Sequence, residues 1–163
     1  GGKTVPLRNR QFVFNHTSVD HTKYDSLRRA IYLPVIRNNL YTLFEQFDFP
    51  DPTMPTGSRN TTTVAPQALL LLNSDLMIDS ADAMAGRVLE STAADEGRVQ
   101  YAYELALGRT PTPSEMERAL GFVSGLTSQS LTDAATVDPA AERKAWALLC
   151  QSLFASNEFV YVR

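Results

Sequence analysis

The sequence has 163 residues, of which 44% are apolar and 20% are charged, and its formal charge is −3 at pH 7. This length and apolar share are enough for one globular domain with its own core, and they exclude a chain that is disordered throughout. The small negative charge argues against a nucleic-acid partner, and no apolar run approaches the length needed for direct membrane insertion. The single cysteine, Cys150, excludes an intrachain disulfide.

The first part of the chain, residues 1–60, is predicted to be rich in loops and to hold a small two-stranded β ribbon. The segments 11–15 and 30–36 have the apolar, β-favouring composition of strands, and Pro34 limits the second to an edge or an end. Apolar residues at helical spacing predict a short helix over 39–47. Such a ribbon is marginal alone, so we expect it to lie on a larger core.

The second part, residues 61–163, is predicted to be a helical bundle because apolar residues recur there at helical spacing. Pro66 suits the first turn of a helix whose run 69–72 is apolar on every side, so we expect this helix to be buried. Residues 73–75 then offer N-cap chemistry for the next helix.

Two further signals mark the later helices. A helix over 95–108 ends at Gly108, and Asp138 with Pro139 begins the last helix, on which Trp146 and Cys150 face inward. The segment 157–163 is predicted to leave as an extended tail. The fold class is therefore mainly α, a bundle of four to six helices with the loop-rich part before it, in one domain over 1–163.

The strongest local signal is the segment Thr112-Pro113-Ser114-Glu115. Thr112 is predicted to cap a helix, Pro113 to occupy its first position, and Glu115 to close a capping box. Cys150, on an apolar helix face, is interpreted as an inert core thiol, because burial disfavours the thiolate.

A group of polar residues surrounds the Pro-rich segment 48–57 and is the candidate ligand site. Two arginines and several amides follow or precede apolar elements there, a set that suits an anionic ligand such as a carboxylate, a sulfate or an anionic glycan. In the alternative interpretation, the two arginines pair with the two aspartates and fix the loop. The residues are Arg37, Asn38, Asn39, Asp48, Asp51, Arg59 and Asn60.

One further cluster, His16, Asp20 and His21, has residue types that bind metals. Its spacing differs from the histidine pair of a zinc helix, so we interpret these residues as polar loop residues and expect no metal site. We also expect no cofactor and assign no catalytic residue.

Five segments in order resemble one known family: RRAIYLPVIRNNL, FDFPDP, RNTTTVAPQALLLLN, ALGRTPTPSE and LCQSLFASNEFVYVR. They resemble the C-terminal planctomycete-specific domain of unknown function, over essentially the whole chain. That domain occurs in large exported proteins that also carry planctomycete-type cytochrome c modules. The resemblance implies export from the cytoplasm, into the periplasm or beyond, and a start part-way through the family's domain. The haem signature Cys-x-x-Cys-His is absent, so haem is not implied.

These observations favour a non-catalytic helical interaction or scaffold module of a larger exported bacterial protein. Its expected partners are sibling domains of the parent chain, including a cytochrome c module. The alternative is a partial enzyme domain that contributes one wall of an active site, for cytochrome-linked redox chemistry or polysaccharide degradation. In that case the arginines and amides around the Pro-rich segment would bind an anion or a sugar.

Overall fold

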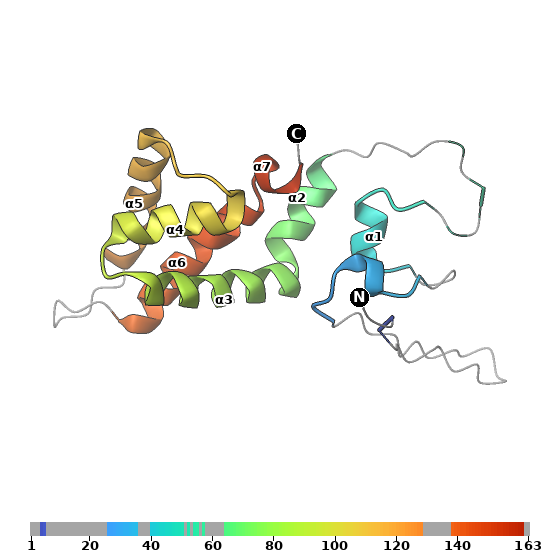
Figure 1. The fold of residues 1–163 in the computed structure, drawn as a ribbon, viewed down its shortest axis with the longest axis horizontal. Coiled ribbons are helices and arrows are strands. Elements are labelled where there is room, and N and C mark those ends of the chain that lie inside the picture. Colours follow the sequence, from blue (N-terminus) through green and yellow to red (C-terminus); the bar gives the residue numbers. More distant parts are fainter. Residues whose placement is uncertain are drawn as a thin grey trace. The chain divides into compact units, whose positions relative to one another are not determined.

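A computed structural model of the protein describes residues 4–5, 26–35, 40–50, 52, 54–55, 57, 64–128 and 138–161. The chain divides into two units, Gly1–Thr63 and Val64–Arg163. Most described residues are helical, which confirms the prediction of a mainly α protein with a helical bundle (Figure 1). No helix within the described ranges combines the length and apolar character that a bilayer crossing demands.

The unit Val64–Arg163 contains six helices in its described residues, and they form the bundle. They are α2 (Val64–Asn73), α3 (Asp75–Ser91), α4 (Asp95–Leu107), α5 (Pro113–Ser128), α6 (Pro139–Phe154) and α7 (Asn157–Val160). Helix α6 packs against each of the other five helices of this unit. It is therefore the element around which the bundle is built.

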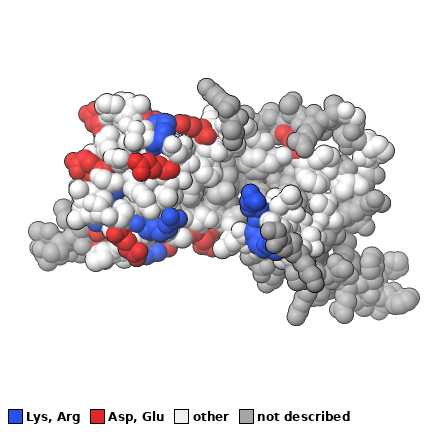
Figure 2. Space-filling view, viewed as in Figure 1, with Lys and Arg blue, Asp and Glu red and all other residues white. Residues whose placement is uncertain are grey.

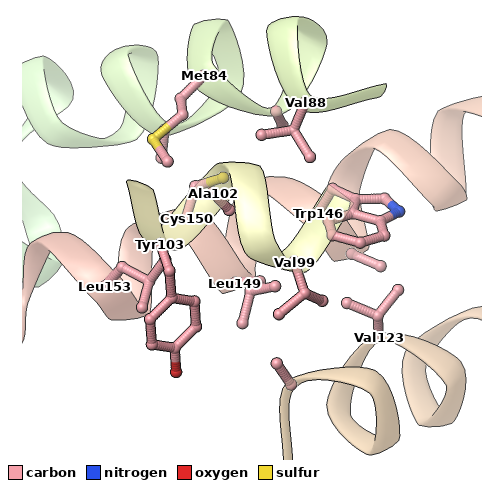
Figure 3. Close-up of a cluster of buried hydrophobic side chains, with 14 residues drawn as sticks. Met84, Val88, Val99, Ala102, Tyr103, Val123, Trp146, Leu149, Cys150 and Leu153 are labelled. Atoms are coloured by element: carbon pink, nitrogen blue, oxygen red, sulfur yellow. The ribbon is translucent and has the colours of Figure 1, made fainter. Parts of the chain in front are cut away.

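The core lies where α3, α4 and α5 meet α6 (Figure 3). Trp146 and Cys150 of α6 are completely buried, as are Val88 of α3 and Val99 of α4. Alanines at the contacts, Ala85 and Ala102 among them, allow close approach of the helices. The inward residues recur at three and four positions along each helix, which is the spacing that keeps side chains on one helix face.

Capping residues define several helix ends as the sequence predicts. The Ser74 hydroxyl accepts a hydrogen bond from the Met77 N–H (3.4 Å), and the Asp138 carboxylate accepts one from the Ala140 N–H (3.0 Å). Gly108, at the end of α4, has a φ of 69°, a left-handed conformation in which an L side chain is strained.

The unit Gly1–Thr63 contains two short elements in its described residues, η1 (Ala30–Tyr32) and α1 (Thr42–Gln46). Helix α1 confirms the predicted short helix, although it is shorter than 39–47. Its end is a Schellman motif, in which the Phe49 N–H donates to the Phe44 carbonyl (3.0 Å) and the two rings stack at 5.2 Å. Asp48 occupies the left-handed position of this motif, with a φ of 57°.

The predicted β strand over 30–36 is wrong, because residues Ala30–Tyr32 form a 3₁₀ turn. The Leu33 N–H donates to the Ala30 carbonyl (3.0 Å), a local hydrogen bond that replaces a strand ladder. The other half of the predicted ribbon, residues 11–15, lies outside the described residues. No β ribbon is found in the part of the chain that the structure describes.

Two further expectations in the helical unit are also wrong. The segment predicted as an extended tail contains helix α7, whose start is capped by Ser156 accepting from the Phe159 N–H (3.3 Å). Helix α2 is not buried on every side. Its inner side buries Gln67 and Leu71, whereas Leu69 and Leu72 on the other side are exposed. The apolar composition of these two segments was therefore not enough to predict the helix α7 or the exposed side of α2.

Trp146 provides a direct test of the core. Because its ring is completely buried, its fluorescence emission should be blue-shifted and poorly quenched by iodide. Trp146→Ala should lower the free energy of unfolding by about 3–5 kcal/mol, the usual cost of removing a large core aromatic. Denaturant unfolding would measure this loss, and an emission spectrum like that of free tryptophan would contradict the core described above.

Candidate functional site

The ligand site predicted around the Pro-rich segment falls mostly outside the described residues. Of its members, the structure describes Asp48 alone, at the end of α1. Arg37, Asn38, Asn39, Asp51, Arg59 and Asn60 lie outside the described residues, as do His16, Asp20 and His21. Both the ligand-binding interpretation and the alternative of paired arginines and aspartates stay predictions.

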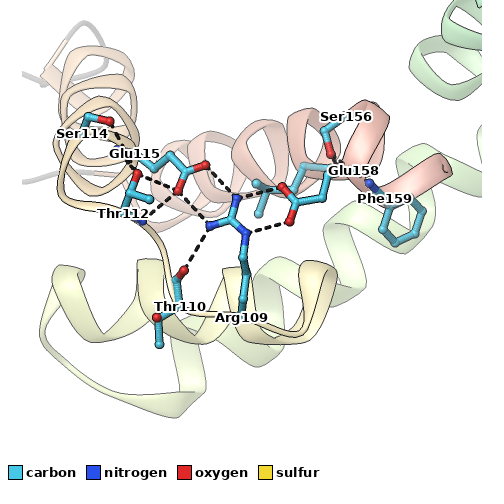
Figure 4. A network of polar contacts seen from close by, with 9 residues as sticks. Arg109, Thr110, Thr112, Ser114, Glu115, Ser156, Glu158 and Phe159 are labelled. Carbon is cyan, nitrogen blue, oxygen red and sulfur yellow. Dashed lines mark hydrogen bonds and ion pairs between the residues drawn. The ribbon is translucent and has the colours of Figure 1, made fainter. Parts of the chain in front are cut away.

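A different polar cluster stands out in the helical unit, around Arg109 in the connection between α4 and α5 (Figure 4). Its Nε and Nη2 atoms donate to the Glu158 carboxylate of α7 at 2.6 and 2.8 Å. Its Nη1 and Nη2 atoms donate to the Glu115 carboxylate of α5 at 2.9 and 2.8 Å. Arg109 thus joins two carboxylates from two helices.

The guanidinium of Arg109 has no donor left for a ligand. Its fifth hydrogen bond runs from Nη1 to the Thr110 carbonyl at 3.0 Å, and an arginine side chain has five N–H donors in all. The carboxylates of Glu158 and Glu115 hold the pKa of Arg109 above its ordinary value. The cluster is therefore a structural joint between helices in this arrangement, rather than a site open to an anion.

Glu115 also serves the capping box that the sequence predicts. Its carboxylate accepts from the Thr112 N–H (2.7 Å) and from the Thr112 hydroxyl (2.8 Å), and its own N–H donates to the Thr112 hydroxyl (3.4 Å). The capping box is confirmed. Hydrogen bonds from Arg109 first, and from Thr112 next, lower the pKa of Glu115 from 4.5 to about 2.

Two other ion pairs connect α6 to its neighbours at the edge of the core. The Arg98 guanidinium of α4 contacts the Glu142 carboxylate of α6 at 3.0 Å. The Arg143 guanidinium of α6 contacts the Asp82 carboxylate of α3 at 2.7 Å. The hydrogen bond from Arg143 is the main cause that lowers the pKa of Asp82. In the view of Figure 2, acidic and basic side chains are interspersed over this unit.

The thiol of Cys150 lies in the core in its protonated form. Cys150 is completely buried, and burial raises the pKa of its thiol to about 12, so it is protonated at neutral pH. Within the described ranges, no three His, Cys, Asp or Glu residues gather to hold a metal ion. The arrangement thus places charged groups in helix contacts and the thiol in the core.

Sequence reasoning identified Glu115 and Thr112 but missed Arg109 and Glu158. Arg109 follows Gly108, the C-terminal stop of a predicted helix, and Glu158 lies in the segment predicted as an extended tail. The two residues are 49 positions apart, and no local pattern predicts a contact over that separation. The available signal was that both belong to segments that carry the family resemblance, ALGRTPTPSE and LCQSLFASNEFVYVR.

Thr112→Ala tests the capping box. The change removes the oxygen that accepts from the Glu115 N–H, so it should lower the free energy of unfolding by about 1 kcal/mol. Thr110→Ala is the matched control, because Thr110 contributes its carbonyl to this cluster and would keep it. Chemical denaturation would compare the two variants, and equal stabilities would contradict the role of the Thr112 hydroxyl.

The Glu115 carboxylate should make the free energy of unfolding depend on pH in the acidic range. Its pKa is about 2 in the folded protein against an ordinary value of 4.5. A depressed folded pKa gives stability that is fully present above pH 4.5 and is lost as the pH falls toward 2. Glu115→Gln should therefore reduce the pH dependence of the unfolding midpoint between about pH 5 and pH 2.

A matched control for this acid effect is Glu117→Gln, which removes an exposed carboxylate from the same helix. Thermal or urea unfolding would be followed over the same pH range for both variants and the unchanged protein. If Glu115→Gln leaves the slope of the midpoint against pH unaltered, the carboxylate does not stabilise the fold through its ionised form.

Comparisons with known proteins give a family but no characterised relative. No curated protein and no solved structure matches the chain. The model of the family PSD1, described as "Protein of unknown function (DUF1553)", matches residues 1–123, well over half of the chain. The match includes α2, α3 and α4 and extends into α5. The chain therefore belongs to the DUF1553 family of proteins of unknown function.

Proposed function

We propose that the chain is a non-catalytic helical module that packs against a sibling domain of a larger exported bacterial protein. The resemblance to a planctomycete-specific domain supports the setting, including export and a neighbouring cytochrome c module as one such sibling. Membership of the DUF1553 family supports the coarser statement, a domain of unknown function. The proposal adds a role, which is to present a helical surface for packing.

The observation that carries this proposal is the exposed apolar side of α2. Leu69 is 61% exposed and Leu72 is 45% exposed, and their spacing of three residues places them on one side of the helix. Ile78, near the start of α3, is 45% exposed as well. Exposed apolar surface of this kind is stabilised when another protein surface covers it. A sibling domain is the cover that the resemblance supports.

The state of the polar side chains also supports a packing role. The donors of Arg109 are all engaged in hydrogen bonds within the unit. The pKa of Cys150, at about 12, keeps its thiol protonated at neutral pH and therefore a poor nucleophile. These groups stabilise the helix arrangement on which α2 presents its apolar side.

The test uses the longer protein that contains this chain. Leu69→Glu with Leu72→Glu should weaken packing of a sibling domain on α2, because burying a carboxylate without a partner is costly. Hydrogen exchange measured by mass spectrometry should then rise at the covering surface of that sibling. Phe122→Glu is the matched control, since Phe122 is 43% exposed on α5, and it should leave that exchange unchanged.

Two results would contradict the proposal. One is that the α2 variants leave hydrogen exchange in every sibling domain unchanged. The other is that the chain binds a sulfated oligosaccharide in calorimetry and loses that binding in Arg37→Ala with Arg59→Ala. The second result would favour the partial enzyme domain with a ligand-binding face around the Pro-rich segment.

A further inference from the structure

Helix α7 is too short to hold its own position. It has four residues, and an isolated helix of that length is unstable in water. Side-chain contacts fix it instead. Glu158 accepts two hydrogen bonds from Arg109, and the ring centroids of Phe159 and of Phe154 in α6 lie 5.0 Å apart. These contacts attach one end of the C-terminal segment to the bundle.

The other end of this segment reaches α2. The Tyr161 hydroxyl, directly after α7, donates a hydrogen bond to the side-chain carbonyl of Gln67. Gln67 is 5% exposed and lies on the inner side of α2. A buried amide oxygen needs hydrogen-bond donors, because leaving it without them costs free energy. The contact therefore connects the C-terminal segment to the inner side of α2.

Helix α2 stands outside the main apolar core. The core cluster of buried residues draws on α3, α4, α5 and α6 and includes none of the described side chains of α2. Helix α2 packs against α3 and α6, and two polar contacts also hold it: the bond from Tyr161, and one from the Gln151 side chain to the Leu72 carbonyl (2.7 Å). The core helices thus have their own apolar stabilisation. Among the described side chains of α2, by contrast, Leu71 is the one buried apolar residue, and it lies outside this cluster.

We propose that residues 157–161 form a strap that holds α2 on the bundle, with Arg109 anchoring one end and Gln67 the other. Opening the strap releases α2 while the core of α3, α4, α5 and α6 stays folded. The strap would control how the exposed Leu69 and Leu72 are presented, a consequence that rests on the proposed packing function. The strap itself does not depend on that function, so the two can fail separately.

Hydrogen exchange of the full 163-residue chain, followed by mass spectrometry, tests the strap. Tyr161→Phe removes the hydroxyl that donates to Gln67. The backbone amides of α2 should exchange about tenfold faster as a result. Glu158→Gln weakens the other end of the strap and should give the same pattern. In both variants the amides of α4 and α6 should exchange at their original rates.

Asp82→Asn is the matched control. It weakens the ion pair between α3 and α6, which is in the same bundle but does not involve the strap, so α2 exchange should stay unchanged. The buried emission of Trp146 would verify that each variant is folded. If Glu158→Gln does not fold, the result for Tyr161→Phe alone settles the test.

The strap is refuted if α2 exchange stays unchanged in Tyr161→Phe. It is also refuted if α2 is unprotected in the original chain, or if all helices lose protection together.

Discussion

The structure of the helical unit depends on the burial of one face of α6. Trp146 and Cys150 on that face are completely buried, and α3, α4 and α5 supply the side chains that cover them. Burying Trp146 removes more apolar surface from water than burying any other single residue of this core. Because α6 contacts every other helix of the unit, the positions of those helices follow from how they cover it.

Charged residues then fix the edges of this arrangement. The pairs of Arg98 with Glu142 and of Arg143 with Asp82 join α6 to α4 and α3, and Arg109 connects α5 with α7. Exposed ion pairs contribute little to stability on average. Arg109 differs in using every donor of a planar guanidinium, which gives its contacts defined geometry. Such pairs set the relative orientation of helices whose association comes from apolar burial.

Sequence reasoning predicted those features that arise from neighbouring residues. The capping box of Thr112 and Glu115, the helix end at Gly108 and the inward position of Trp146 are local patterns, and each is confirmed. It failed where a distant contact overrides local composition. The segment containing Glu158 has β-favouring residues, but capping by Ser156 and the contact with Arg109 hold it as a helix turn.

The same reasoning failed differently for α2, whereas the candidate ligand site stays a prediction. Four successive leucines in α2 carry no amphipathic pattern, so nothing local indicates which of them face inward; the structure buries Leu71 and exposes Leu69 and Leu72. At the ligand site, Asp48 takes the left-handed position that ends α1, a backbone role that aspartate tolerates. Its expected pairing with Arg37 or Arg59 stays a prediction.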